Sequence, residues 1–272
     1  MKIALLANGR GDISKTAAGV KNALEDLGAQ VLIPRDGHFP PKDGEKTMAS
    51  ADLVISLGGD GTLIHVAKRA AALGKPVLGV NCGRLGYMTG MEAGELSRLS
   101  ALIRGEYTVQ SRMMLEATVE SGAASKTFTA LNEVVISRGS LSRMVELQVC
   151  CNGRKVASYR ADGVIVATPT GSTAYSLSAG GPVVDPAVSC MLLTPICPHS
   201  LYTRPFIFDA GVTLSVAQLD RNPLFLTVDG EEEIPLASSD RVTLRRSGVS
   251  ASIIRLDSRA FHEVLEQKLT DR

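Results

Sequence analysis

The sequence predicts an α/β N-terminal domain, in which helices flank a parallel sheet, and an all-β, sandwich-like C-terminal domain. Up to Gly105, continuous apolar runs alternate with helix-compatible stretches, which is typical of parallel strands covered on both faces. From Tyr107 onward, short β-rich runs are separated by turn residues, which is typical of a sandwich. We expect domains at 1–105 and 106–257, and a C-terminal helix in 258–272 that packs on the first domain.

Apolar spacing predicts the elements of the first domain in order. Strands are expected at 2–7, 31–33, 53–57 and 77–80, and helices at 12–27, 63–73 and 95–103. Glycines follow these helices at positions 28, 74 and 105, where glycine commonly ends a helix. Residues 34–50 are rich in proline, glycine and charge, so we expect a surface loop there.

The second domain is predicted as a series of strands followed by one helix. The strands are expected at 107–119, 126–131, 133–138, 143–151, 154–160, 163–168, 212–219, 224–228 and 241–246. Asn152-Gly153 and Asp229-Gly230 are typical hairpin turns between them. In the final stretch, apolar residues recur at helical spacing from Phe261 to Leu269, which predicts an amphipathic helix.

Composition excludes several classes of function. The chain has 272 residues and a net charge of +1, and without a basic stripe a nucleic-acid partner is not expected. No apolar run approaches the ~18 residues of a membrane span, so no membrane partner is expected either. The five cysteines lack Cys-x-x-Cys spacing and are typical of small buried hydrophobes in the reducing cytoplasm. The four histidines are scattered, so we expect no protein-held metal site.

The glycine-rich run at 58–62 follows an apolar strand and precedes a helix. Glycines let the backbone approach a ligand closely, and amides at a helix N-terminus favour a phosphate. Asp60 in the centre would repel phosphate, so its presence indicates a task such as taking a proton from a hydroxyl or holding a metal. This pattern favours phosphoryl transfer to an alcohol. The alternative is a strand-to-helix turn that merely needs glycine.

A second motif at 159–182 leads from an apolar strand into a cluster of small hydroxyl residues and glycines. Buried hydroxyls need hydrogen-bond partners, and a sugar or phosphate would supply them. Tyr175 offers a flat face on which an aromatic base could stack. The alternative is a Ser/Thr-rich surface loop.

Two short polar motifs admit two interpretations each. Asn132-Glu133 is either a polar turn with an exposed edge charge at Glu133, or an acceptor of ribose hydroxyls at the mouth of apolar strands. Asp229-Gly230 is a hairpin turn by default, and a turn that faces a site by the family resemblance described next.

Taken together, these motifs resemble the bacterial NAD kinases, which use ATP or polyphosphate as phosphate donor. The resemblance covers essentially the whole chain in family order. It rests on the runs at 58–62, 79–87, 132–133, 162–182, 194–200 and 228–230. The glycine run alone is shared with diacylglycerol kinases and phosphofructokinase-like enzymes, whereas the run at 162–182 is specific. Tyr87 stands where the family often has Phe.

The resemblance implies a kinase that phosphorylates the 2′-hydroxyl of the adenosine ribose of NAD to give NADP. Asp60 matches the carboxylate that receives the hydroxyl proton. The donor phosphate would be held by Gly58, Gly59, Gly61 and Thr62. The implied NAD-binding residues are Asp60, Gly61, Tyr87, Asn132, Glu133, Arg160, Asp162, Thr170, Thr173, Ala174, Tyr175, Ser178 and Asp229.

The same resemblance implies ATP and NAD as ligands, a NAD site between the two domains, and a homodimer or homotetramer in the cytoplasm. Mg²⁺ or another divalent cation would bridge the donor phosphates. Two other functions compete with this one. A lipid kinase of the diacylglycerol type would need an apolar acceptor groove, yet 168–178 is rich in hydroxyls. A non-catalytic NAD(P)-binding regulator would have no use for Asp60.

Overall fold

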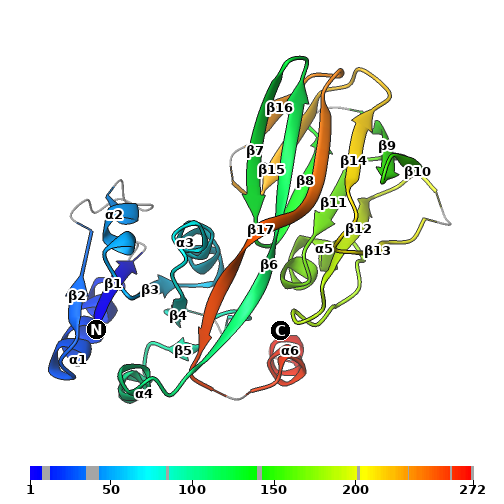
Figure 1. Ribbon diagram of the computed structural model, residues 1–272. Helices are drawn as coiled ribbons and strands as arrows, with labels where there is room; N and C mark the ends of the chain where they lie inside the picture. Colours follow the sequence, from blue (N-terminus) through cyan, green and yellow to red (C-terminus); the bar gives the residue numbers. More distant parts are fainter. Residues whose placement is uncertain are drawn as a thin grey trace. The chain divides into compact units, whose positions relative to one another are not determined.

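The chain forms two compact units, which Figure 1 shows in a computed structural model. Residues 1–7, 13–34, 43–83, 86–139, 143–200, 203–231, 233–257 and 259–270 are described. The first unit comprises Met1–Ser111 with Ala251–Arg272, and the second comprises Arg112–Ser250. The limits therefore differ from the expected ones at 105 and 257. They fall within two long strands, β6 (Thr108–Ser121) and β17 (Arg241–Arg255), each of which has residues in both units.

A parallel sheet forms the centre of the first unit. Its strands run in the order β2 (Gln30–Leu32), β1 (Lys2–Ala7), β3 (Leu53–Gly58) and β4 (Val77–Asn81). All of these pairs are parallel, and the short β5 (Met91–Glu92) and the end of β17 also pair with β4. β3 and β4 are buried along their whole length, as continuous apolar runs predict.

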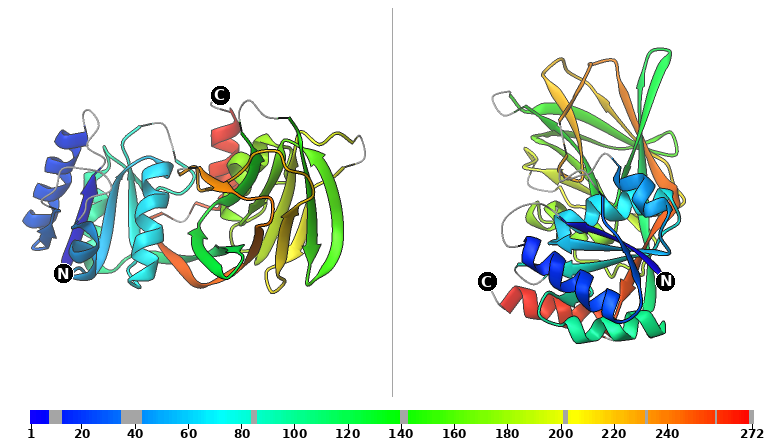
Figure 2. Two further views of the ribbon diagram at one scale, coloured as in Figure 1. Left: turned by 90° about the horizontal axis from the view of Figure 1, so that it is seen from above. Right: turned by 90° about the vertical axis from the view of Figure 1, so that its left-hand side faces the viewer.

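Helices cover both faces of this sheet, as the fold class predicts. The helices of the unit are α1 (Ile13–Asp26), α2 (Gly44–Ala49), α3 (Asp60–Ala72), the 3₁₀ turn η1 (Leu96–Arg98), α4 (Leu99–Arg104) and α6 (Phe261–Thr270). α1 and α3 lie on opposite faces (Figure 2). Gly105 ends α4 in the left-handed conformation (φ 76°), in agreement with the predicted helix end.

The expected surface loop at 34–50 is wrong over its last residues, because they form α2. Met48 on this helix is 0% exposed, so α2 contributes to the core despite its polar composition. A helix of 6 residues shows too little periodicity to be recognised among prolines, glycines and charges. Residues 35–42 of the expected loop lie outside the described residues.

The second unit contains two layers of antiparallel strands, as a sandwich requires. One sheet has the order β13 (Phe206–Asp209), β12 (Cys190–Ile196), β11 (Gly163–Ala167), β8 (Glu133–Arg138), β15 (Leu224–Val228) and β16 (Ile234–Leu236). The other contains β10 (Arg154–Ala161), β9 (Val145–Cys151), β14 (Leu214–Gln218), β7 (Ala124–Ala130) and parts of β6 and β17. A core of buried residues such as Leu147, Val164 and Leu226 joins strands of both sheets.

Three strands of this unit, β12, β13 and β16, were not predicted, and β17 is longer than the expected 241–246. β12 is buried at every position but contains Pro195, which argues against a central strand. The register explains why proline is tolerated. β13 pairs only with Cys190–Leu193 of β12, so that Pro195 pairs on one side only, with Val164.

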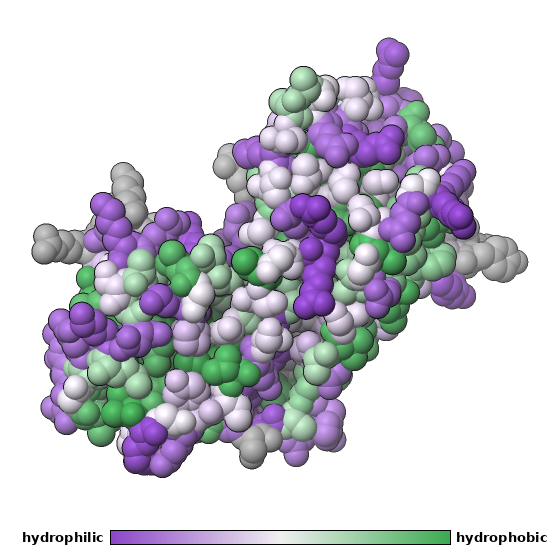
Figure 3. Space-filling view, viewed as in Figure 1, coloured by the Kyte–Doolittle hydropathy of each residue, from purple (hydrophilic) through white to green (hydrophobic). Residues whose placement is uncertain are grey.

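On the one face that Figure 3 shows, apolar residues (green) lie among hydrophilic ones (purple). Ile207 and Phe206 on β13 are among the more exposed, at 56% and 42%. All five cysteines are free thiols, but the expectation that they are buried holds only for Cys190, because Cys82, Cys150 and Cys151 are half-buried and Cys197 is exposed. Among the described residues, no helix is long and apolar enough to cross a membrane.

We predict that Met48→Ala lowers the free energy of unfolding of the first unit by about 2–5 kcal/mol, because it leaves a cavity under α2. Denaturant unfolding measures this change. Lys46→Ala on the same helix is exposed and serves as the control, with an expected change within about 0.5 kcal/mol. Equal small changes in both variants would show that α2 does not belong to the core.

Candidate functional site

The glycine turn lies at the carboxyl edge of the parallel sheet. β3 ends at Gly58, and α3 begins at Asp60 with Gly59 as its N-cap. The connections of β1 and β3 lead in opposite directions along the sheet, to β2 and β4, and ligands of α/β sheets bind outside such a switch point. The first amides of α3 have no partner within the helix, as at any helix N-terminus.

The three glycines of this turn differ in why they are needed. A side chain at Gly58 would place its Cβ 2.6 Å from the Cβ of the buried Thr62, so this glycine serves the packing of strand on helix. Gly59 and Gly61 are exposed, and a Cβ at either would meet no atom of the described residues within 4 Å. The turn therefore presents bare backbone at Gly59 and Gly61, where a phosphate could approach.

Two backbone amides hold the carboxylate of Asp60. Tyr87 N donates to Oδ2 at 2.7 Å and Met88 N donates to Oδ1 at 3.0 Å. A Cβ at Gly86 would lie 2.5 Å from Asp60 Oδ1, so only glycine allows the loop to come this close. The loop and the helix thus fix the orientation of Asp60, and Tyr87 is brought beside it half-buried.

The loop after β4, which carries Tyr87 and Met88, is itself anchored to the sheet. Gly90 N donates to Gly79 O at 3.0 Å, and Arg255 Nη1 donates to Thr89 O at 3.2 Å. The neighbouring Asn81 donates to Glu92 Oε2 at 2.8 Å. Of the motif at 79–87, residues 84 and 85 lie outside the described residues.

In the second unit, Asp229 clamps the turn at 131–133. Its Oδ2 accepts from Leu131 N at 2.8 Å, and its Oδ1 accepts from Asn132 N at 2.8 Å and Glu133 N at 3.0 Å. Asp229 itself has a φ of 49° in the turn between β15 and β16. The hairpin interpretation is thus confirmed, and the side chain has a second role in holding the Asn132-Glu133 turn.

Glu133 is buried, with 7% of its surface exposed, so the alternative of an exposed edge charge is wrong. Burial, and then the charge of Asp229, raise the pKa of Glu133 to about 8. Its Oε2 and the Oδ1 of Asn132 are buried and accept no hydrogen bond from the described residues. Buried polar atoms of this kind are usually satisfied, so these two are candidate contacts for a ligand.

The hydroxyls of 168–178 are largely used inside the protein. Thr168 Oγ1 donates to Leu131 O at 2.6 Å and accepts from Gly171 N at 3.1 Å. Ser172 bonds the backbone of Val184, and Ser176 Oγ lies 2.9 Å from Thr194 Oγ1. These three hydroxyl residues are 0% exposed, so the surface-loop alternative is wrong, but they do not require a sugar or phosphate as partner.

The remaining residues of this motif form a 3₁₀ turn, η2 (Thr170–Thr173), and a short helix, α5 (Tyr175–Ser178). Thr170 is 7% exposed and Thr173 is half-buried. Ala174 connects the two elements, and its amide donates to Gly171 O at 3.0 Å. Tyr175 is 44% exposed, so its ring is available for stacking, and Ser178 is exposed beside it on α5.

An ion pair joins Asp162 to Arg138, a residue that sequence reasoning missed. Arg138 Nε donates to Asp162 Oδ1 at 2.6 Å, and the hydrogen bond raises the pKa of Arg138. No sequence signal marks Arg138, because it meets Asp162 only through the pairing of β8 with β11.

Burial raises the pKa of Tyr175, and the charges of Cys197 and Asp162 add to this effect. Arg160 is exposed, and its carbonyl accepts from His199 N at 2.8 Å.

The predicted residues are divided between the two units. The first unit holds Gly58, Gly59, Asp60, Gly61, Thr62 and Tyr87. The second holds Asn132, Glu133, Arg160, Asp162, Thr170, Thr173, Ala174, Tyr175, Ser178 and Asp229. Within the described ranges, no group of three His, Cys, Asp or Glu residues could hold a metal ion.

Comparisons with known proteins identify two domains of one family in the chain. The model of the ATP-NAD kinase N-terminal domain matches residues 20–107, and that of the ATP-NAD kinase C-terminal domain matches 131–256. A protein of Symbiobacterium thermophilum named NAD kinase is 50% identical over 80% of this chain and 78% of its own length. One of Desulforamulus reducens, also named NAD kinase, is 40% identical over 99% of this chain and 97% of its own.

Solved structures share the fold. A yeast NADH kinase complexed with NADH has a TM-score of 0.88 and 24% identity, covering 99% of this chain and 87% of that one. An NAD kinase from Archaeoglobus fulgidus in complex with ATP has a TM-score of 0.80 and 24% identity over the full length of both chains. With both family models and near full-length relatives in agreement, the chain belongs to the ATP-NAD kinase family.

Proposed function

We propose that this protein transfers a phosphoryl group from ATP to the 2′-hydroxyl of the adenosine ribose of NAD, giving NADP and ADP. The observation that carries this proposal is the Asp60 carboxylate, held by two amides beside a turn that presents bare backbone. The names of the relatives support the choice of NAD as acceptor.

In the proposed reaction, the 2′-oxygen of NAD forms a bond to the terminal phosphorus of ATP while the bond from that phosphorus to ADP breaks. Asp60 accepts the hydroxyl proton, and ADP leaves with the electron pair of the broken bond. Phosphoryl transfer is accelerated mainly by positioning and by stabilising charge. A fixed carboxylate provides the positioning. A base within hydrogen-bond reach of the hydroxyl raises the reaction rate by about 10²–10⁴-fold.

The donor would bind at the glycine turn through the backbone of Gly59, Gly61 and Thr62, as phosphates do at helix N-termini. Gly58 supports this turn by its packing on Thr62. The divalent cation, Mg²⁺ in the simplest case, would arrive as part of the substrate on the donor phosphates. The backbone at Gly59 and Gly61 fits this arrangement, since a Cβ at either would meet no atom of the described residues within 4 Å.

The second unit would recognise NAD. Glu133, neutral near pH 7 on account of its raised pKa, can donate a hydrogen bond as well as accept one, and Asn132 Oδ1 offers an acceptor. Tyr175 would stack on a base. Asp229 would act by positioning, because its carboxylate already accepts from three amides. Further contacts are proposed for Tyr87, Arg160, Asp162, Thr170, Thr173, Ala174 and Ser178.

We also propose a homodimer or homotetramer in the cytoplasm. The five free thiols support a reducing compartment. β13 supports self-association, because it lies at the end of its sheet and carries the exposed Phe206 and Ile207. An apolar strand with an unpaired edge is a site where another chain can add.

We predict that Asp60→Asn lowers kcat by about 100-fold or more, close to 3 kcal/mol, because the amide cannot accept the proton. A coupled assay of NADP formation from NAD and Mg-ATP measures this loss, and NAD affinity is expected to change far less. Asp26→Asn, which removes the same charge from an exposed side chain on α1, is the control. A near-normal kcat in folded Asp60→Asn would remove Asp60 as the base.

We predict a pH dependence of stability from Glu133. Its pKa of about 8 in the folded chain lies above the unfolded value, so the folded state holds an extra proton between these values and stability falls as pH rises. Between pH 6 and 8 the loss from this group is expected to be up to about 2 kcal/mol. Denaturant unfolding at several pH values measures this loss, and Glu133→Gln should not show it. If the free energy of unfolding of Glu133→Gln depended on pH as steeply as that of wild type, the prediction would be contradicted.

A further inference from the structure

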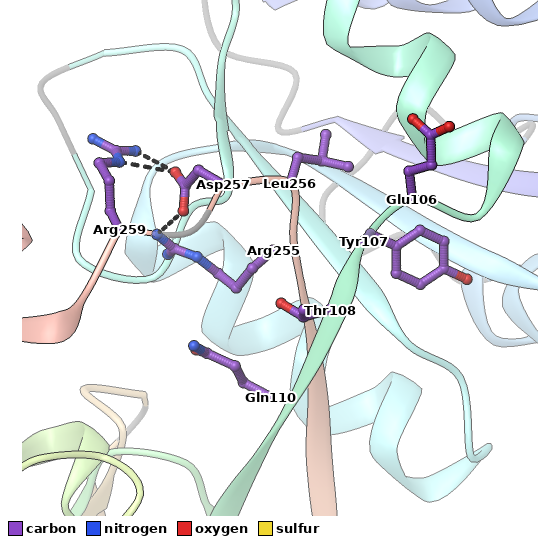
Figure 4. Close-up of a pocket in the computed structure, with 8 residues that line it drawn as sticks. All are labelled: Glu106, Tyr107, Thr108, Gln110, Arg255, Leu256, Asp257 and Arg259. Carbon is purple, nitrogen blue, oxygen red and sulfur yellow. Dashed lines mark hydrogen bonds and ion pairs between the residues drawn. The ribbon is translucent and has the colours of Figure 1, made fainter.

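A pocket with a volume of about 650 Å³ lies in the first unit, between the start of β6 and the chain after β17 (Figure 4). Thr108 and Gln110 line it from β6, and Arg255, Asp257 and Arg259 line it from the other side. This volume is typical of sites for small-molecule ligands. None of these residues belongs to the groups proposed above for NAD or the phosphate donor.

The pocket carries an excess of positive charge. Arg255 Nη2 donates to Asp257 Oδ1 at 2.9 Å, and Arg259 Nε and Nη2 donate to Asp257 Oδ2 at 2.9 and 2.7 Å. Burial raises the pKa of Asp257, but the hydrogen bonds from both arginines outweigh this and hold its pKa below the ordinary value. Asp257 thus neutralises one of the two guanidinium groups. A backbone hydrogen bond and, less strongly, the charge of Arg259 also lower the pKa of Glu95, but that carboxylate is already paired with Arg98.

Glu106, the other acid at this pocket, does not supply the missing negative charge. It lies apart from the two arginines in Figure 4 and forms a forked pair with Arg104, with distances of 2.8 and 2.7 Å. Arg255 is 5% exposed, and its Nε has no hydrogen-bond partner among the described residues. A buried charged donor without an acceptor is costly, and an oxyanion is the ligand that a guanidinium fork fits best.

Arg255 also connects this pocket to Asp60. Its Nη1 donates to the carbonyl of Thr89, which follows directly on the two residues whose amides hold the Asp60 carboxylate. A Cβ at Gly90 would lie 2.8 Å from Ile254 O, so the loop is tightly packed on the end of β17. A ligand that forms a hydrogen bond with Arg255 would therefore act on the loop that orients Asp60.

We propose that this pocket binds a small multivalent oxyanion through Arg255 and Arg259, and that the bound anion is sensed at Asp60 through Thr89. The ligand would be an oxyanion that accepts hydrogen bonds from both guanidinium groups, and either a phosphate-bearing or a carboxylate-bearing effector supplies one. The site is distinct from the glycine turn, so the proposal stands whether or not the chain phosphorylates NAD.

Isothermal titration calorimetry of the full chain in metal-free buffer, with pyrophosphate and with malonate, tests binding and separates the two sources. We expect Arg259→Gln to weaken binding of at least one of them by about tenfold or more. Arg245→Gln, the same change at an exposed arginine of the second unit that pairs with Glu116, is the control and should stay within about twofold. Binding of neither probe, or equal affinity in wild type and folded Arg259→Gln, would overturn the proposal.

Hydrogen exchange tests the connection to Asp60. In wild type, the bound probe should change amide exchange at Tyr87 and Met88 as well as around Thr108 and Asp257, and Arg259→Gln should lose both effects. The variant also separates this pocket from the glycine turn, because pyrophosphate bound at the turn would act equally in both proteins. Binding that leaves Tyr87 and Met88 unchanged would contradict the connection.

Discussion

The orientation of one carboxylate by backbone amides is the constraint on which the proposed catalytic site of the first unit depends. Asp60 is the first residue of α3, and amides from the loop after β4 bond both of its oxygens. The loop reaches this position only because Gly86 leaves room for the carboxylate. In the proposed reaction, a base held in this way would need no reorganisation before it accepts a proton, which is how positioning contributes to phosphoryl transfer.

The second unit uses a carboxylate in a related way but for a different purpose. Asp229 accepts from three consecutive amides and so fixes the turn that carries Asn132 and Glu133. Fixing this turn keeps Glu133 buried beside Asp229, and burial together with that negative charge makes it a neutral group near pH 7. One carboxylate thus holds the backbone, while the other is available to a ligand as donor or acceptor.

Local patterns in the sequence were sufficient for most of the fold. The strands around Leu57 and Val80 could be predicted because a run of apolar residues records burial on both faces. α2 and β12 could not, because one is too short to show a period and the other contains Pro195, which is tolerated only through its one-sided pairing.

The candidate site was predictable where chemistry resides in contiguous residues, as around Asp60. It was not predictable where a partner comes from a distant strand, as with Arg138 and Asp162. The hydroxyls of Thr168 and Ser172 indicated a pocket in the sequence, but the structure uses them to hold its own backbone.

The central claim is that the loop at Gly86 orients Asp60, and the kcat of Gly86→Ala tests it most directly. The added Cβ would lie 2.5 Å from Asp60 Oδ1, so the loop or the carboxylate must move. We expect kcat for NADP formation to fall by about tenfold or more, since small misplacements of a catalytic group are costly. Gly83→Ala, where a Cβ would meet no atom of the described part of the chain within 4 Å, should keep kcat within about twofold. Equal kcat values in folded Gly86→Ala and Gly83→Ala would contradict the account.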